Sequence, residues 1–171
     1  MPADITTAVS GGLIAGSVTM LGWFVTDLQR RKESKRNRRA EYIHRQISEL
    51  YAPLSLLANK EYVYRELQNE LIDKGDKDAS IYTKEFVVPT QLEIYNLIQS
   101  KAHLLGHGEK LSSFQAAQAH CSRALSLYKL AHKVSRNFPH ISAERMPDEF
   151  KDDVKHVLEE LQSEYDKLLR V

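Results

Sequence analysis

The sequence has a single cysteine, Cys121, among its 171 residues. One thiol cannot form an internal disulfide, and such rare use of cysteine is typical of reducing compartments, where a free cysteine usually packs as a small apolar residue. Only seven glycines and five prolines occur, and neither glycine-rich turns nor β-branched runs indicate a sheet. The composition excludes a disulfide scaffold and favours helices.

The sequence also lacks the short motifs of common catalytic chemistry: it has no phosphate-binding glycine loop, no Gly-x-Ser-x-Gly elbow and no His-Glu-x-x-His stretch. His103 and His107 have the spacing of a helical metal pair, but we expect Gly106 to break the helix between them, and no third ligand lies nearby. His120 and Cys121 are adjacent, and adjacent helical side chains point about 100° apart, so a thiol and its base cannot face each other there. We therefore expect no metal, no cofactor and no enzymatic activity.

Charge is absent from Ile5 to Thr26. A helix rises about 1.5 Å per residue, so about 20 uncharged residues cross a hydrocarbon core about 30 Å thick. A secretory signal peptide would begin with positive charge and end in small residues, whereas this chain begins with Asp4 and ends the stretch in Trp23, Phe24 and Val25. The stretch predicts a membrane span; a buried soluble helix and an uncleaved interfacial helix are the alternatives.

Positive charge follows the uncharged stretch directly. Under the positive-inside rule this order places the N-terminus outside and the rest of the chain in the cytoplasm, with Trp23 at the interface. The same side chains are expected to contact anionic lipid head groups, at about 1 kcal/mol each near the surface. Nucleic acid is the alternative ligand, although no aromatic stacking residues accompany the charges. The basic residues are Arg30, Arg31, Lys32, Lys35, Arg36, Arg38 and Arg39.

The formal net charge of +1 conceals this asymmetry, because the remainder of the chain is net acidic. With 42% hydrophobic and 27% charged residues, the composition is that of an ordinary folded domain. The predicted organisation is a transmembrane helix at 1–28, a basic juxtamembrane neck at 29–40 and a cytoplasmic α-helical bundle at 41–171. The predicted location is a membrane, with the bulk of the chain in the cytoplasm; the resemblance described below implies the bacterial inner (plasma) membrane.

Small residues recur every four positions within the predicted span. Small side chains at this spacing leave a groove along which two helix backbones approach closely, so this pattern predicts association with further copies of the chain inside the bilayer. One row consists of Ala8, Gly12 and Gly16, and a second consists of Gly11, Ala15 and Thr19.

After the basic run, apolar residues follow helical periodicity. Pro53 interrupts the series without shifting its phase, which predicts a kink between Glu49 and Pro53 within an element that extends to about Ile72. The stripe consists of Ile43, Ile47, Leu50, Leu54, Leu57, Tyr64 and Leu71.

Three further helices are expected, which makes the fold all-α: one N-terminal transmembrane helix continuing into a bundle of about four helices. Residues 74–82 are predicted to be a polar loop. The spacing of Thr90 and Glu93 is that of a capping box. The predicted helices run from Thr90 to Leu105 with Gly106 as the C-cap, from Ser112 or Ser113 to Asn137–Pro139, and from Pro147 to Arg170.

Arg39 and His44 are separated by four residues, which resembles the Arg-x4-6-His signature of the HEPN ribonucleases. In such a pair the arginine can hold a phosphate while the histidine moves protons. The position beside the predicted span departs from that family, whose motif usually lies on a later helix, and Arg136 to His140 is one residue too short. An RNase or RNA-binding accessory protein is therefore retained as an alternative function.

The layout of one span, a basic neck and a small helical domain resembles the membrane accessory proteins of bacterial antiviral systems, including those encoded beside CRISPR effectors. The segment QISELYAPLSLL at 46–57 is similar to the opening of many bacterial single-span proteins. The resemblance implies a non-enzymatic membrane effector that works as a homo-oligomer, with an oligomeric pore as one form. The other alternative is a passive anchor for a cytoplasmic protein partner.

Overall fold

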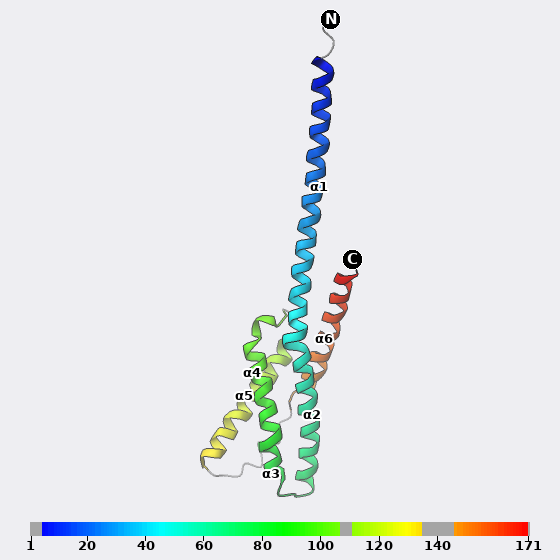
Figure 1. Ribbon diagram of the computed structural model, residues 1–171. Coiled ribbons are helices and arrows are strands. Elements are labelled where there is room, and N and C mark those ends of the chain that lie inside the picture. The colour runs from blue at the N-terminus through cyan, green and yellow to red at the C-terminus, as the bar shows by residue number, and fades with distance from the viewer. Residues whose placement is uncertain (1–4, 107–110, 135–145, 171) are drawn as a thin grey trace. The chain divides into compact units, whose positions relative to one another are not determined.

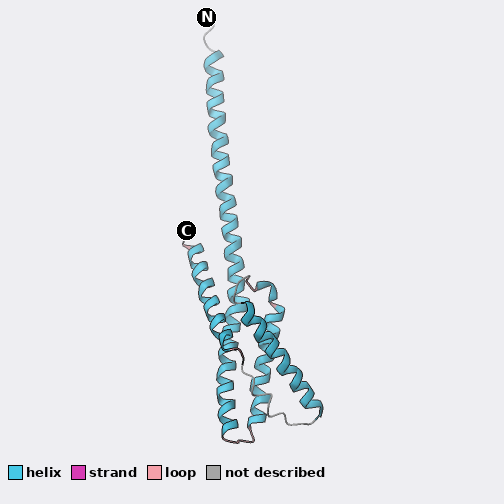
Figure 2. Ribbon diagram, turned by 180° about the vertical axis from the view of Figure 1, so that it is seen from behind, coloured by secondary structure: helices cyan, strands magenta, loops and turns pink. Residues whose placement is uncertain are grey.

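The computed structural model describes residues 5–106, 111–134 and 146–170, and the side chains of residues 23–106, 112–130 and 146–170. Over these residues the protein is all-α and contains no strand (Figure 1; Figure 2). The chain divides into two compact units, Met1–Tyr42 and Ile43–Val171. The first unit is helical from Ile5 onward, and the second is a helical bundle.

The first unit consists of the N-terminal part of helix α1 (Ile5–Gln46). Within it, Arg31 Nε lies 2.8 Å from the carboxylate of Asp27, one turn back, a spacing that supports an exposed helix. Among the residues whose side chains are described, no helix is long and apolar enough to cross a membrane. The predicted transmembrane helix at 1–28 lies outside these residues except for 23–28.

Helix α1 passes into helix α2 (Ala52–Asp73) through a π-helical turn, η1 (Ile47–Tyr51). The N–H of Ala52 donates to the carbonyl of Ile47, five residues back instead of four. Pro53 has no N–H to donate, and its ring would clash with the carbonyl four residues back, so the wider turn accommodates it. The helix thus continues through Pro53 as expected, and the predicted irregularity at this point is a π turn.

A second proline has the same arrangement. Before Pro89 lies a π-helical turn, η2 (Thr83–Val87), in which the N–H of Val88 donates to the carbonyl of Thr83. Through this turn, short helix α3 (Ala79–Tyr82) passes into helix α4 (Val88–Ser100). Pro89 therefore does not block the helix from extending backwards.

Two local predictions are consequently wrong. The polar loop ends before residue 79 and does not reach 82, because the π turn lets helical structure begin well ahead of Pro89. Thr90 is not an N-cap: it is buried inside the helix, and its hydroxyl donates to the carbonyl of Phe86 at 2.8 Å. The chain reversal itself is short, and Gly75 has the positive φ, 67°, that the turn requires.

Helix α4 ends at Ser100, earlier than predicted, and a 3-10 turn, η3 (Ala102–Leu104), follows. Leu104 is fully buried, and its carbonyl accepts a hydrogen bond of 2.8 Å from Gln46 Nε2. The burial of Leu104 and the hydrogen bond to its carbonyl from α1 favour an end of α4 before Leu105. Gly106 is therefore not the C-cap of α4.

The remaining helices are α5 (Leu111–Val134) and α6 (Asp148–Leu169). The predicted end of α5 at 137–139 lies outside the described residues. Helix α6 begins after Pro147 with acidic residues in its first turn and has Lys167 in its last, as predicted, which suits the helix dipole.

Helices α2, α4, α5 and α6 form the bundle: α2 and α5 each pack against both α4 and α6. The bundle of about four helices is therefore confirmed. At its centre the ring of Phe114 meets Tyr51 edge-on at 5.9 Å and Phe150 at 5.3 Å between centroids. These rings join α5 to η1 and α6, and Leu50, Leu54, Ile94 and Ile98 complete the apolar core around them.

Candidate functional site

The residues predicted to pack in the span belong to helix α1, whose backbone is described there. Their side chains are not among those described. The prediction for Ala8, Gly11, Gly12, Ala15, Gly16 and Thr19 therefore stays a prediction.

The basic run is displayed to solvent on α1. Arg36 is half-buried and the other six basic side chains are exposed. Immediately before them, Trp23 and Phe24 are 79% and 63% exposed. A belt of exposed aromatic side chains followed by exposed cations is the pattern found at a membrane interface.

His44, one half of the HEPN-like pair, lies against α6. Its ring is 5.7 Å from the ring of Tyr165, and the two planes are inclined by 32°. Arg39 belongs to the other unit of the chain. The pairing of the two residues stays a prediction, and the observed contact of His44 is a packing contact with an aromatic ring.

The bundle contains a buried ion pair that the sequence did not reveal. Arg65 Nε donates to Glu61 Oε1 at 2.9 Å, and the two side chains are only 8% and 4% exposed. An acidic side chain usually lies in solvent, and Glu61 is an exception to that rule. The one sequence signal for it is phase, since Glu61 and Arg65 follow the helical stripe of Leu50 and Leu54, but phase alone does not separate a buried charge from a solvated one.

Hydrogen bonds extend from this pair to three other elements. Gln91 Nε2 of α4 donates to Glu61 Oε1 at 3.2 Å and lies 3.2 Å from His120 Nε2 of α5. Arg65 Nη1 donates to Gln68 Oε1 at 3.3 Å. Gln68 in turn donates to the hydroxyl of Thr83 in η2. This polar network joins the interior faces of the helices, as buried polar groups require.

Cys121 lies beside the network, and burial raises the pKa of its thiol to about 12, with the nearby carboxylate of Glu61 adding to the effect. The thiol therefore stays protonated at neutral pH and is a poor nucleophile. The expectation that Cys121 is a small core residue is confirmed, and His120 beside it is only half-buried.

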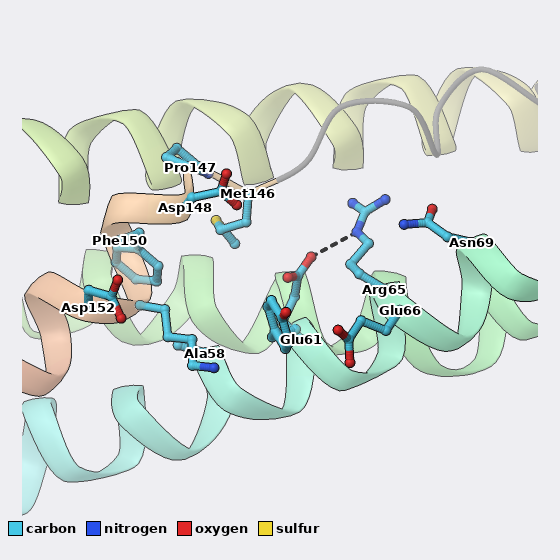
Figure 3. A pocket seen from close by; sticks show the side chains of 12 residues that line it. Ala58, Glu61, Arg65, Glu66, Asn69, Met146, Pro147, Asp148, Phe150 and Asp152 are labelled. Atoms are coloured by element: carbon cyan, nitrogen blue, oxygen red, sulfur yellow. Dashed lines mark hydrogen bonds and ion pairs between the residues drawn. The ribbon is translucent and has the colours of Figure 1, made fainter.

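A cleft of about 480 Å³ opens between α2 and the start of α6. Figure 3 shows Glu61 and Arg65 joined in the wall supplied by α2, with Phe150 and Asp152 on α6. At the rim, Lys151 Nζ lies 4.1 Å from the ring centroid of Tyr62, a cation–π contact that ties the two helices together. Four of the twelve residues that line the cleft thus already bind one another.

No group of three or more His, Cys, Asp and Glu residues is placed to hold a metal ion within the described part of the chain. Comparison of the chain with family models, curated proteins and solved structures finds no match. Its function has to be argued from its own residues.

Proposed function

We propose that this protein is a single-pass membrane protein with its N-terminus outside and its helical bundle in the cytoplasm, and that it works by self-association at the membrane and not by catalysis. The observation that carries the proposal is the uncharged stretch from Ile5 to Thr26, followed at once by the basic run.

Three features of α1 support this reading. Its backbone is helical from Ile5 through the basic run, and a helix is the only single segment that satisfies its own backbone hydrogen bonds in lipid. Trp23 and Phe24 are exposed where the aromatic belt is expected, and six of the seven basic side chains that follow them are exposed. The aromatic side chains suit the membrane–water interface, and the basic side chains suit the anionic head groups of the cytoplasmic leaflet.

The interior of the bundle supports a binding role over a chemical one. The charges of Glu61 and Arg65 satisfy each other, and the thiol of Cys121 keeps its proton. The polar groups that a catalytic site would use therefore hold the helices together. A role in bacterial defence rests only on the resemblance of the layout and is part of the proposal on that basis.

Alkaline carbonate extraction of membranes tests the insertion. We expect the full chain to stay in the pellet and a variant with Leu13→Arg and Val18→Arg to be released, because each central arginine costs about 2.5–3.5 kcal/mol on insertion scales. Release of the unsubstituted chain would overturn the proposal. Labelling of a cysteine placed before Ile5 from outside intact cells tests the orientation.

Assembly through the span is tested separately. Replacing Gly12 and Gly16 with leucine fills the predicted groove, and we expect a smaller assembly in detergent. Leakage of dye from liposomes that contain the protein then separates two modes of action. Leakage indicates a pore, whereas intact vesicles together with a stoichiometric partner in pulldowns indicate a passive anchor.

A further inference from the structure

Helix α2 has a second apolar stripe that faces away from the core. Leu56, Val63 and Leu67 follow one another at intervals of seven and four residues, and they are 73%, 57% and 43% exposed. Single exposed apolar residues are ordinary, but several along one face of a helix whose opposite face is already buried are typical of a face that a partner covers. Within the described residues of the bundle, these three side chains stay exposed.

This stripe is continuous with the neighbouring surface of η2 and α4. Lys60, which lies within the stripe, reaches Glu93 of α4 at 3.8 Å and sits 5.7 Å from the ring centroid of Tyr64. The ring of Tyr64 meets Phe86 of η2 at 5.6 Å, and Phe86 is itself 44% exposed. We call this surface the α2–α4 face; its members are Leu56, Lys60, Val63, Tyr64, Leu67, Phe86 and Glu93.

An open groove of about 750 Å³ lies at one end of the α2–α4 face. Pro53 and Leu57 of α2 and Leu97 of α4 supply its apolar lining, and Glu93 borders it. Leu56, the most exposed leucine of the stripe, is adjacent in sequence to the groove residue Leu57. Lys60, one turn after Leu56 on α2, reaches Glu93, which borders the groove, so the protruding leucine and the groove belong to the same face.

We propose that the α2–α4 face docks a second copy of the same bundle; this rests on the self-association proposed above and names the surface that carries it. A two-fold symmetric interface has to be complementary to itself. The face meets that condition twice: it has both ridge and groove, and its Lys60 and Glu93 can pair with Glu93 and Lys60 of a partner. A nucleic acid would require net positive charge, which this neutral pair does not provide.

Cross-linking of the full chain in membranes tests the face. Leu67→Cys places a thiol on the α2–α4 face, and Leu130→Cys places one on α5 at a comparable exposure of 51%. With a short bis-maleimide, we expect a cross-linked dimer from Leu67→Cys and not from Leu130→Cys. Cys121 is buried and does not compete. Equal yields from the two positions would overturn the proposal.

Substitutions on the face supply a second measurement. Val63→Glu in the Leu67→Cys chain should lower the dimer yield about tenfold, the change produced by losing one central contact, whereas Leu130→Glu should leave it unchanged. An unchanged yield with Val63→Glu contradicts the proposal. Thermal unfolding followed by circular dichroism verifies that both variants fold, as expected for exposed positions.

Charge exchange makes the test specific for a second copy. Lys60→Glu and Glu93→Lys should each reduce the dimer yield when expressed alone, because each leaves like charges at this pair. Co-expressing the two variant chains should restore the yield, because the charges are then complementary only across the two-fold axis and still repel within each chain. Failure of the restoration argues for a different partner on this face. Carbonate extraction of the same variants keeps this outcome separate from failure of the membrane proposal.

Discussion

The buried side of α2 changes its chemistry halfway along the helix. Its first half presents Leu54 and Ala58 to the aromatic core, and its second half presents Glu61, Arg65 and Gln68 to the polar network. All five side chains are buried to a similar degree. Equally buried side chains of one helix are therefore held in two different ways, by apolar packing in the first half and by polar contacts in the second.

The two halves of α2 differ in how much the burial of their side chains contributes to the stability of the fold. Burying a leucine or phenylalanine side chain stabilises a fold by about 1.5–3 kcal/mol. Burying an ion pair gains little overall, because the loss of hydration offsets the attraction, but leaving one charge without its partner is costly. We infer that the apolar half supplies stability, while the polar half fixes which helices adjoin α2. The following predictions test that division.

The largest effect is expected from Glu61→Ala. It leaves Arg65 buried without its carboxylate, which should lower the free energy of unfolding by about 3–5 kcal/mol. Denaturant unfolding of the full chain in one fixed detergent measures it. The double variant Glu61→Met with Arg65→Leu is the control, and near-wild-type stability is expected because neither charge remains. If the double variant were as unstable as Glu61→Ala, the polar half would be a source of stability after all.

In the apolar half, Leu54→Ala should cost about 2–5 kcal/mol, since it leaves a cavity at a fully buried position. The matched control is Leu56→Ala, two residues away on the outward stripe, where the free energy of unfolding of the monomeric full chain should change by less than about 0.5 kcal/mol. The same unfolding measurement serves both variants. Similar losses from the two would contradict the assignment of inward and outward stripes.

The smallest effect is expected at Glu49, where η1 meets the end of α4. Hydrogen bonds from Lys101, at 2.7 Å, and from Arg45 lower the pKa of this carboxyl below 4.5. A lowered pKa means that the contribution to stability is present above the unfolded-state value and is lost as the pH falls through the folded-state value.

Glu49→Gln should therefore lower the melting temperature slightly at pH 7, and the difference from the unsubstituted protein should vanish in acid, below the lowered pKa. Melting curves recorded over a pH series measure this. Glu159→Gln, at an exposed site 4.0 Å from Lys155, is the control and should have little effect at any pH. A difference for Glu49→Gln that persists in acid would exclude the carboxylate as its cause.

Much of the bundle was readable from periodicity. Three members of the predicted stripe, Ile43, Leu50 and Leu54, are fully buried, and α6 begins within one residue of its predicted start. The other four members are only half-buried: Ile47, Leu57, Tyr64 and Leu71. The helix through Pro53 was also predictable, because the apolar phase continues on both sides of it. These features depend on residues that are close in sequence, so the periodicity of the sequence is enough to predict them.

The region around Pro89 and the polar network were not predicted. At Pro89 the usual rule that proline stops a helix failed, because a π turn satisfies the backbone in another way. Glu61 and Gln91 are 30 residues apart, and a glutamate has no local mark that distinguishes a buried ion pair from a solvated surface. Only the packing of α2 against its neighbours makes that distinction.

The sequence by itself determined that this protein is helical, where its apolar and basic stretches lie, and that it forms no internal disulfide, because these follow from composition and from spacings of a few residues. The tertiary structure alone decided which polar residues enter the core, and which apolar stripe of α2 stays outside it. The physical reason is that the energy of burying a charge or exposing a leucine depends on the neighbours that three-dimensional packing brings to it.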